Sequence, residues 1–214
     1  MDNQRVETTL YSLDESVPAG AERRTSDRHL SLLRVGSLTI GDRKELCLIK
    51  NVSAGGMLIR AYSSIEPDTR ITVELKEGEP VSDTARWSEG DCVGINFDEP
   101  IDIIGLLSSP LGGQCPRMPR IEVHCTAWVR EGATVHRTKA VDISQGGIRV
   151  TSAKELAIGA EVIVTVVGLA PIAGAVRWNN NDSYGVMFNR ALDLGVLVAW
   201  LQDQQERERA RMAG

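Results

Sequence analysis

The chain has 214 residues, 42% of them hydrophobic, and a formal net charge of −5, which is typical of a folded protein of one or two domains. No run approaches the ~18 apolar residues of a membrane span, and residues 1–20 lack the basic and apolar regions of a signal peptide. Residues 1–110 carry a net charge of −7 and residues 111–214 one of +2, so no nucleic acid partner is expected, because phosphate backbones bind basic surfaces. We expect a cytoplasmic protein without membrane insertion.

Cysteines and histidines give no sign of a metal site. There is no CxxC pair, and no cysteine stands at metal-ligand spacing from a histidine. Buried or incidental thiols in a reducing compartment are therefore favoured over disulfides or zinc. We expect no metal and no cofactor. The residues concerned are Cys47, Cys92, Cys115, Cys125, His29, His124 and His136.

The predicted elements are mainly short strands. Runs with period-two alternation are separated by turn-forming stretches such as GDRKE, NVSAG and SEGD, which favours a barrel or a sandwich. Six strands are predicted at 32–40, 45–50, 56–62, 70–76, 81–87 and 92–97, and six more at 121–130, 137–143, 147–152, 161–168, 173–178 and 184–188.

Each set of six strands is followed by a helical pattern, weak over 100–107 and stronger over 192–205. In the second pattern the apolar residues recur at i, i+3, i+4 and i+7, so we expect this face to pack on the strands. The domains expected are 20–107 and 114–205. The remaining segments are a flexible start at 1–19, a linker at 108–113 rich in Pro, Gly and Ser, and a frayed tail at 206–214.

An internal repeat runs through the chain at an offset of 91 residues. NVSAGG at 51–56 aligns with DISQGG at 142–147, and ARWSEGDCVGINF aligns with VRWNNNDSYGVMF. A repeat of this length indicates a domain duplication, since the units of a solenoid are only about 20–50 residues long.

The repeated turn has two interpretations. Asn, Asp and Ser side chains often hydrogen-bond to nearby backbone, and Gly tolerates positive φ, so a tight structural turn explains the motif about as well as a binding site does. An arginine cluster, AERRTSDRH, precedes the first copy of the turn in an otherwise acidic half.

Together, Arg24-x-x-x-Arg28 and Asn51-x-Ser53-x-x-Gly56 resemble the PilZ domain, the bacterial receptor module for cyclic di-GMP. The resemblance extends over the whole chain as two copies. It implies an all-β fold of two six-stranded PilZ-like β-barrels in tandem, each followed by a C-terminal helix. It also implies that the ligand is cyclic di-GMP.

The chemistry agrees with this resemblance. A cyclic dinucleotide offers phosphates and guanine edges, and the planar donor fork of Arg matches both. By the resemblance, Arg24 and Arg28 close over the ligand, while Asn51, Ser53 and the glycines contact it from the barrel. Arg23, just before the pattern, is compatible with a stacked pair of ligands. The ligand residues predicted in the first copy are Arg23, Arg24, Arg28, Asn51, Ser53, Gly55 and Gly56; a solvated charge run balanced by Glu22 and Asp27 is the alternative for the arginines.

The second copy departs from the pattern at its arginines. Cys115 and Pro119 stand where Arg24 and Arg28 stand in the first copy, and the fixed φ of proline restricts movement of this segment. We therefore expect a degenerate domain that does not bind, in which Asp142 has a structural role. Its possible weak site consists of Arg117, Arg120, Asp142, Ser144, Gly146 and Gly147.

Three functions from different classes remain open. The favoured one is a cyclic di-GMP receptor or adaptor, in which ligand orders residues 20–28 and so signals to an unidentified protein partner or to the second domain. The alternative is a PilZ scaffold that binds no ligand and acts through protein contacts, with the helix around 197–201 docking a partner. No catalytic triad or phosphate loop supports an enzyme, so no catalytic residues are assigned. For Trp87 and Trp178, a structural role is favoured over base stacking.

Overall fold

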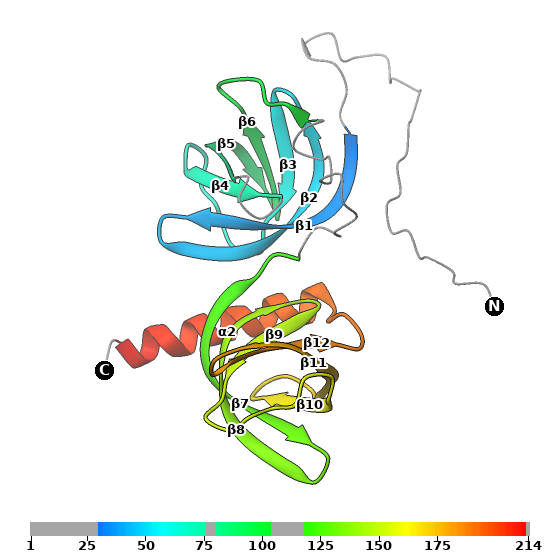
Figure 1. Cartoon of the computed structure of the whole chain (residues 1–214). Helices are drawn as coiled ribbons and strands as arrows, with labels where there is room; N and C mark the ends of the chain where they lie inside the picture. Colours follow the sequence, from blue (N-terminus) through cyan, green and yellow to red (C-terminus); the bar gives the residue numbers. More distant parts are fainter. Residues whose placement is uncertain (1–29, 76–79, 104–117, 213–214) are drawn as a thin grey trace, which may run out of the picture. The chain divides into compact units, whose positions relative to one another are not determined.

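The computed structural model describes residues 30–75, 80–103 and 118–212. The chain divides into two compact units, Met1–Arg117 and Met118–Gly214. Within the described residues each unit contains a closed six-stranded antiparallel barrel, so the all-β fold with two barrels is confirmed (Figure 1).

The first barrel is built from strands in the spatial order β1-β2-β3-β6-β5-β4. Its core is formed by inward-facing aliphatic side chains, among which Leu38, Ile49, Ile59 and Val73 are almost fully buried. The strands are β1 (Leu30–Ile40), β2 (Arg43–Ser53), β3 (Gly56–Arg60), β4 (Arg70–Glu74), β5 (Pro80–Glu89) and β6 (Cys92–Asn96).

The second barrel has the same strand connections, in the order β10-β11-β12-β9-β8-β7. Its strands start at, or within one residue of, the positions given by adding 91 to those of the first barrel. The sequence repeat is therefore a repeat of structure without insertion or deletion. The strands are β7 (Ile121–Glu131), β8 (Thr134–Ser144), β9 (Gly147–Thr151), β10 (Glu161–Val166), β11 (Ile172–Asn180) and β12 (Ser183–Phe188).

Backbone irregularities recur at the same offset. β2 carries a bulge at Lys50 and β5 one at Arg86, and the equivalent strands of the second barrel carry bulges at Val141 and Arg177. A bulge inserts one residue into a strand and shifts every side chain beyond it to the other face. Positive φ angles recur as well, at Gly41 and Gly132, Asp68 and Gly159, and Gly90 and Asn181.

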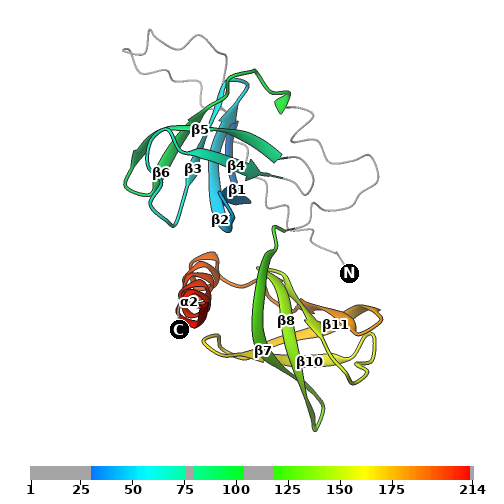
Figure 2. The ribbon, with the colours of Figure 1, turned by 90° about the vertical axis from the view of Figure 1, so that its left-hand side faces the viewer.

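Helix α2 (Leu194–Met212) follows the second barrel, and it lies beside the strands in Figures 1 and 2. Asp193 caps its start, because its carboxylate accepts a hydrogen bond from the Val196 amide at 3.1 Å. The Trp200 indole donates to the Val167 carbonyl at 2.8 Å. Leu197 and Leu201 are buried, which agrees with the predicted packing of this face.

The tail predicted to fray from residue 206 is helical as far as Met212, because the helix continues past its apolar stripe, with Arg207 and Asp203 paired one turn apart at 2.7 Å. The weaker helix predicted at 100–107 does not begin where expected, because residues 100–102 are not helical and helix is present only at residue 103. Its residues 104–107, the linker at 108–113 and the segment at 1–19 lie outside the described residues.

Candidate functional site

The repeated turn is built in the same way in both barrels. Ser53 donates its hydroxyl to the Gly56 carbonyl at 3.2 Å, and Ser144 donates to the Gly147 carbonyl at 3.3 Å. Both serines are almost fully buried. Each hydroxyl therefore closes its own turn, and this explains why both copies keep Ser.

The second glycine of each turn, Gly56 or Gly147, is required by close packing against neighbouring backbone. A Cβ added at Gly56 would lie 2.5 Å from the Ile95 carbonyl oxygen, and one at Gly147 would lie 2.5 Å from the Val186 carbonyl oxygen. The preceding residue, Gly146, accepts a hydrogen bond from the Phe188 amide at 2.9 Å. The equivalent carbonyl of Gly55 accepts a hydrogen bond from the Phe97 amide at 3.0 Å. Each turn is therefore hydrogen-bonded to the end of the last strand of its barrel.

The residue that begins each turn points outward because of a bulge. In β2, Ile49 and Val52 are both fully buried, so simple alternation fails between them and both Lys50 and Asn51 face away from the core. Asn51 then stands opposite Leu58 on β3. Asp142 of β8 stands opposite Arg149 on β9 for the same reason.

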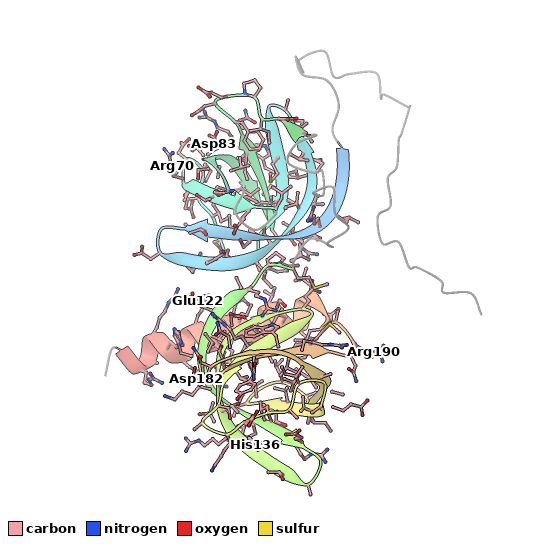
Figure 3. All side chains as sticks on the ribbon, viewed as in Figure 1. Arg70, Asp83, Glu122, His136, Asp182 and Arg190 are labelled. Atoms are coloured by element: carbon pink, nitrogen blue, oxygen red, sulfur yellow. The ribbon has the colours of Figure 1, made fainter. Side chains whose placement is uncertain are left out.

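In the second barrel the outward position is occupied by an ion-pair cluster. Asp142 is 6% exposed, and its two carboxylate oxygens lie 2.6 Å from Arg120 Nη1 and 2.6 Å from Arg149 Nε. A buried carboxylate is stable only when it is paired in this way. Glu122, labelled in Figure 3 on β7, stands opposite Asp142 in the register.

Among the described residues, the first barrel has no such cluster at the equivalent position. Asn51 replaces Asp142, and Leu58 replaces Arg149. Among the residues that the structure describes, none hydrogen-bonds to the Asn51 side chain, which is half-buried. An amide both donates and accepts, so Asn51 presents a donor and an acceptor on the outer surface that no described residue uses.

Cross-strand register extends this surface into a row, which we call the outer row. In the first barrel it consists of Asn51, Leu58, Gly94 and Trp87, on four adjacent strands. In the second barrel it consists of Asp142, Arg149, Gly185 and Trp178.

The two tryptophans reach the outer row through the bulges in β5 and β11. Ala85 is fully buried, and strict alternation would point Trp87 inward with it. The extra residue Arg86 reverses this, so that Trp87 is 46% exposed and Trp178 is 40% exposed. Each indole occupies the space over a glycine of the next strand, where a Cβ on Gly94 or Gly185 would overlap it.

Several predicted site residues lie outside the described residues. These are Arg23, Arg24 and Arg28 of the first copy and Arg117 of the second. The predicted contacts of these arginines with a ligand therefore stay predictions. Arg149 was missed by the sequence reasoning, although its place two residues after the repeated GG was a signal that could have identified it.

Other kinds of chemistry find no support in the described residues. No group of three or more His, Cys, Asp or Glu is arranged to hold a metal ion there. In the same part of the chain, none of the helices is long and apolar enough to cross a membrane. Burial raises the pKa of the Cys47 thiol to about 12, so this cysteine is not a nucleophile near neutral pH.

The chain was compared with solved structures. Those similar to it include PlzA of Borreliella burgdorferi in complex with c-di-GMP (14% identity, 78% of this chain and 86% of that chain covered, TM-score 0.37). Another is the inhibitor of motility MotI/DgrA of Bacillus subtilis (13% identity, 83% of this chain and 97% of that chain covered, TM-score 0.34). A third is YcgR of Escherichia coli in complex with c-di-GMP (16% identity, 85% of this chain and 87% of that chain covered, TM-score 0.32). The search of curated proteins gave no match.

A family model describes the second unit directly. The model of the PilZ domain matches residues 114–203, which cover the whole second barrel and the first half of α2. The match thus falls on the copy whose arginine pattern departs from the motif, whereas the sequence resemblance rested on the first copy. This match identifies residues 114–203, the second unit, as a PilZ domain.

Proposed function

We propose that the chain is a cyclic di-GMP receptor whose ligand is bound by the first barrel. The observation that carries this proposal is the difference between the two outer rows. Asp142 is neutralised by guanidinium groups of its own domain, whereas the amide of Asn51 has no partner among the described residues. The first barrel therefore offers hydrogen-bonding capacity that a ligand can use without breaking a pair between described residues.

Charge supports the same assignment. The outer row of the first barrel contains no ionised side chain, so it suits the neutral bases of a dinucleotide. Phosphates then require cations from elsewhere, and Arg24 and Arg28 precede β1 in the sequence. In this proposal the arginine segment closes over the ligand and becomes ordered, which changes the surface offered to a protein partner or to the second unit.

The alternative, a scaffold that binds no ligand, is less well supported. It assigned partner docking to the apolar face of the C-terminal helix. Leu197, Val198 and Leu201 on this face are buried, and the Trp200 indole is bonded to the Val167 carbonyl. This face is therefore already used for packing. We propose that the chain binds its ligand and does not act as an enzyme. We also propose that it does so in the cytoplasm.

Calorimetric titration of cyclic di-GMP tests the proposal. We expect binding by the intact chain, a roughly 10- to 100-fold loss of affinity in Arg24→Ala, because a charge-assisted contact contributes ~1.5–3 kcal/mol, and unchanged affinity in Asp142→Ala. The stoichiometry reports whether one ligand or a stacked pair is bound. No heat of binding with the intact chain, together with no thermal shift, would overturn the proposal.

Limited proteolysis tests the ordering step separately. Trypsin cleaves after arginine, so the peptide bonds after Arg24 and Arg28 are natural reporters. Ligand should slow cleavage at these two sites in the intact chain and leave the sites in Asn51→Ala unprotected. Calorimetric binding without any such protection would retain the receptor and exclude the ordering mechanism.

A further inference from the structure

The second barrel carries a group of basic residues on the outer side of β7 and β8, the two strands of one hairpin (Figure 1). The inward positions of these strands are filled by Ala127, Val129 and Thr138, which are almost fully buried. Alternation along a strand therefore turns the residues between them outward. We call these outward residues the basic face; they are Thr126, Trp128 and Arg130 of β7, with Lys139, Arg137 and Val135 opposite them on β8.

The cations of the basic face are not neutralised by their own domain. Arg130, Arg137 and Lys139 are all exposed, and none of them forms an ion pair with another described residue. The carboxylate of Glu131, at the end of the same hairpin, lies 3.8 Å from His136 Nε2 instead. The basic face therefore presents unpaired positive charge to solvent.

Trp128 lies in the middle of the basic face. Arg137 stands opposite it on β8, and Thr165 stands opposite it on β10. Its side chain is only partly exposed, so it offers a restricted aromatic surface beside an arginine. Tryptophan and arginine are enriched at the centres of protein–protein interfaces, and this pair is typical of such a surface.

The first barrel shows that the fold does not require this charge. At the offset of 91 residues, Leu46 takes the place of Arg137, and it is only 2% exposed. Glu74 takes the place of Thr165, and its carboxylate lies 3.0 Å from the Lys44 ammonium on the same face. A cation on this side of the first barrel is thus paired internally, whereas those of the second barrel are left for a partner.

We propose that the basic face is a docking surface for an acidic segment of a partner protein. Arg137 and Lys139 are two residues apart on one strand, which separates them by about 7 Å. Alternate side chains of an extended peptide have the same spacing, so two carboxylates of such a segment can meet both cations. The arginine fork binds a carboxylate through two parallel hydrogen bonds. This inference goes beyond the proposed function, because it gives the chemistry of a protein partner and needs no bound nucleotide.

A nucleic acid fits the basic face less well than an acidic peptide does. Nucleic acids bind through many phosphate contacts along a polymer, whereas this face supplies the three cations Arg130, Arg137 and Lys139. Residues 1–110 of the same chain carry a net charge of −7, which repels a long polyanion. A short acidic segment needs only a few contacts, so the charges of the face favour it.

Fluorescence anisotropy with a labelled peptide of alternating Glu and Val tests the inference on the full chain. The intact chain should bind this peptide, with an affinity that falls as salt is raised, and should not bind the same peptide with Gln in place of Glu. The double variant Arg137→Gln/Lys139→Gln should bind about tenfold more weakly, as expected for the loss of two ion pairs.

The double variant Lys154→Gln/Arg190→Gln is the matched control. It also removes one Lys and one Arg, both exposed on the second unit and outside the basic face, and it should bind the peptide like the intact chain. No binding of the Glu peptide by the intact chain would overturn the inference, and so would an equal loss of affinity in the two double variants.

A single-stranded oligothymidine separates the two kinds of anion. If it binds the intact chain more tightly than the Glu peptide does, and this binding is lost in Arg137→Gln/Lys139→Gln, the face belongs to a nucleic acid and the inference is wrong. The same variant should bind cyclic di-GMP like the intact chain. Failure of the receptor proposal would therefore show as absent nucleotide binding, whatever the peptide does.

Discussion

Residues 51–56 and 142–147 form the same turn, but the side chains that begin the two turns have different surroundings. Asp142 is held by Arg120 and Arg149, whereas Asn51 faces Leu58 and has no described partner. The shared Ser and Gly residues meet the needs of the barrel. The difference at the first position of the turn therefore says more about function than the motif itself does.

The largest expected effect concerns what the two turns share. Gly56→Ala and Gly147→Ala should each destabilise their barrel by up to about 3 kcal/mol, because each added Cβ would lie 2.5 Å from a carbonyl oxygen of the neighbouring strand. Urea unfolding of the full chain measures this. A loss in one variant only would show that the two turns are not equivalent.

The next effect concerns what the turns do not share. Arg149→Leu makes the second outer row resemble the first and leaves the buried Asp142 with Arg120 alone. We expect a loss of about 2 kcal/mol, since a charged group then lacks one of its partners. Leu58→Arg is the matched control and should change the unfolding free energy by less than about 0.5 kcal/mol, as surface substitutions usually do. A stable Arg149→Leu would mean that the cluster does not hold Asp142.

Substitution of Asn51 addresses the proposed use of the first turn. Asn51→Ala should reduce the affinity for cyclic di-GMP by about tenfold, the value of one good hydrogen bond to a ligand. Its stability should hardly change, because the side chain has no described partner to lose. Calorimetry combined with thermal unfolding measures both, and unchanged affinity would remove Asn51 from the site.

The serines provide a smaller and symmetrical test. Ser53→Ala and Ser144→Ala each remove one hydroxyl bond within the turn and should each cost about 1 kcal/mol of stability. Because Ser53 was also predicted to contact the ligand, titration of Ser53→Ala decides between the two roles. A loss of affinity well beyond the loss of stability would add a ligand contact to the structural one.

The smallest effect lies inside the barrels, where Cys47 and Thr138 occupy equivalent positions. Burial raises the pKa of Cys47 to about 12, so its thiol stays protonated at pH 8 and should not react with a disulfide reagent until the chain unfolds. The reaction with the reagent is measured in the intact chain and in Cys47→Ser, and the difference between them is the contribution of the Cys47 thiol. Rapid reaction of Cys47 in the native chain would contradict its burial.

Much of the fold could be predicted from the sequence. The strands alternate with period two between Gly-rich turns, and the offset of 91 residues aligns every pair of strands. The bulges could not be predicted, because a bulge is a property of two strands in register rather than of one strand. Without the bulge at Arg86, the pattern ARW would place Trp87 inside the barrel.

The site was predictable only in part for the same reason. The motif identified the turn, but Arg149 comes to Asp142 through pairing between β8 and β9 with a bulge in between. Trp87 joins Asn51 across four strands, although the two are far apart in the sequence. Contacts of this kind follow from closure of the barrel, which spacing along the chain does not reveal.

The central claim is that two equivalent turns differ in use, and amide NMR of the intact chain with cyclic di-GMP tests it most directly. Gly55, Gly56, Gly146 and Gly147 report on the two turns within one sample. We predict that ligand shifts the amide signals of Gly55 and Gly56 and leaves those of Gly146 and Gly147 in place. Shifts confined to Gly146 and Gly147 would contradict the account and assign the ligand to the second barrel.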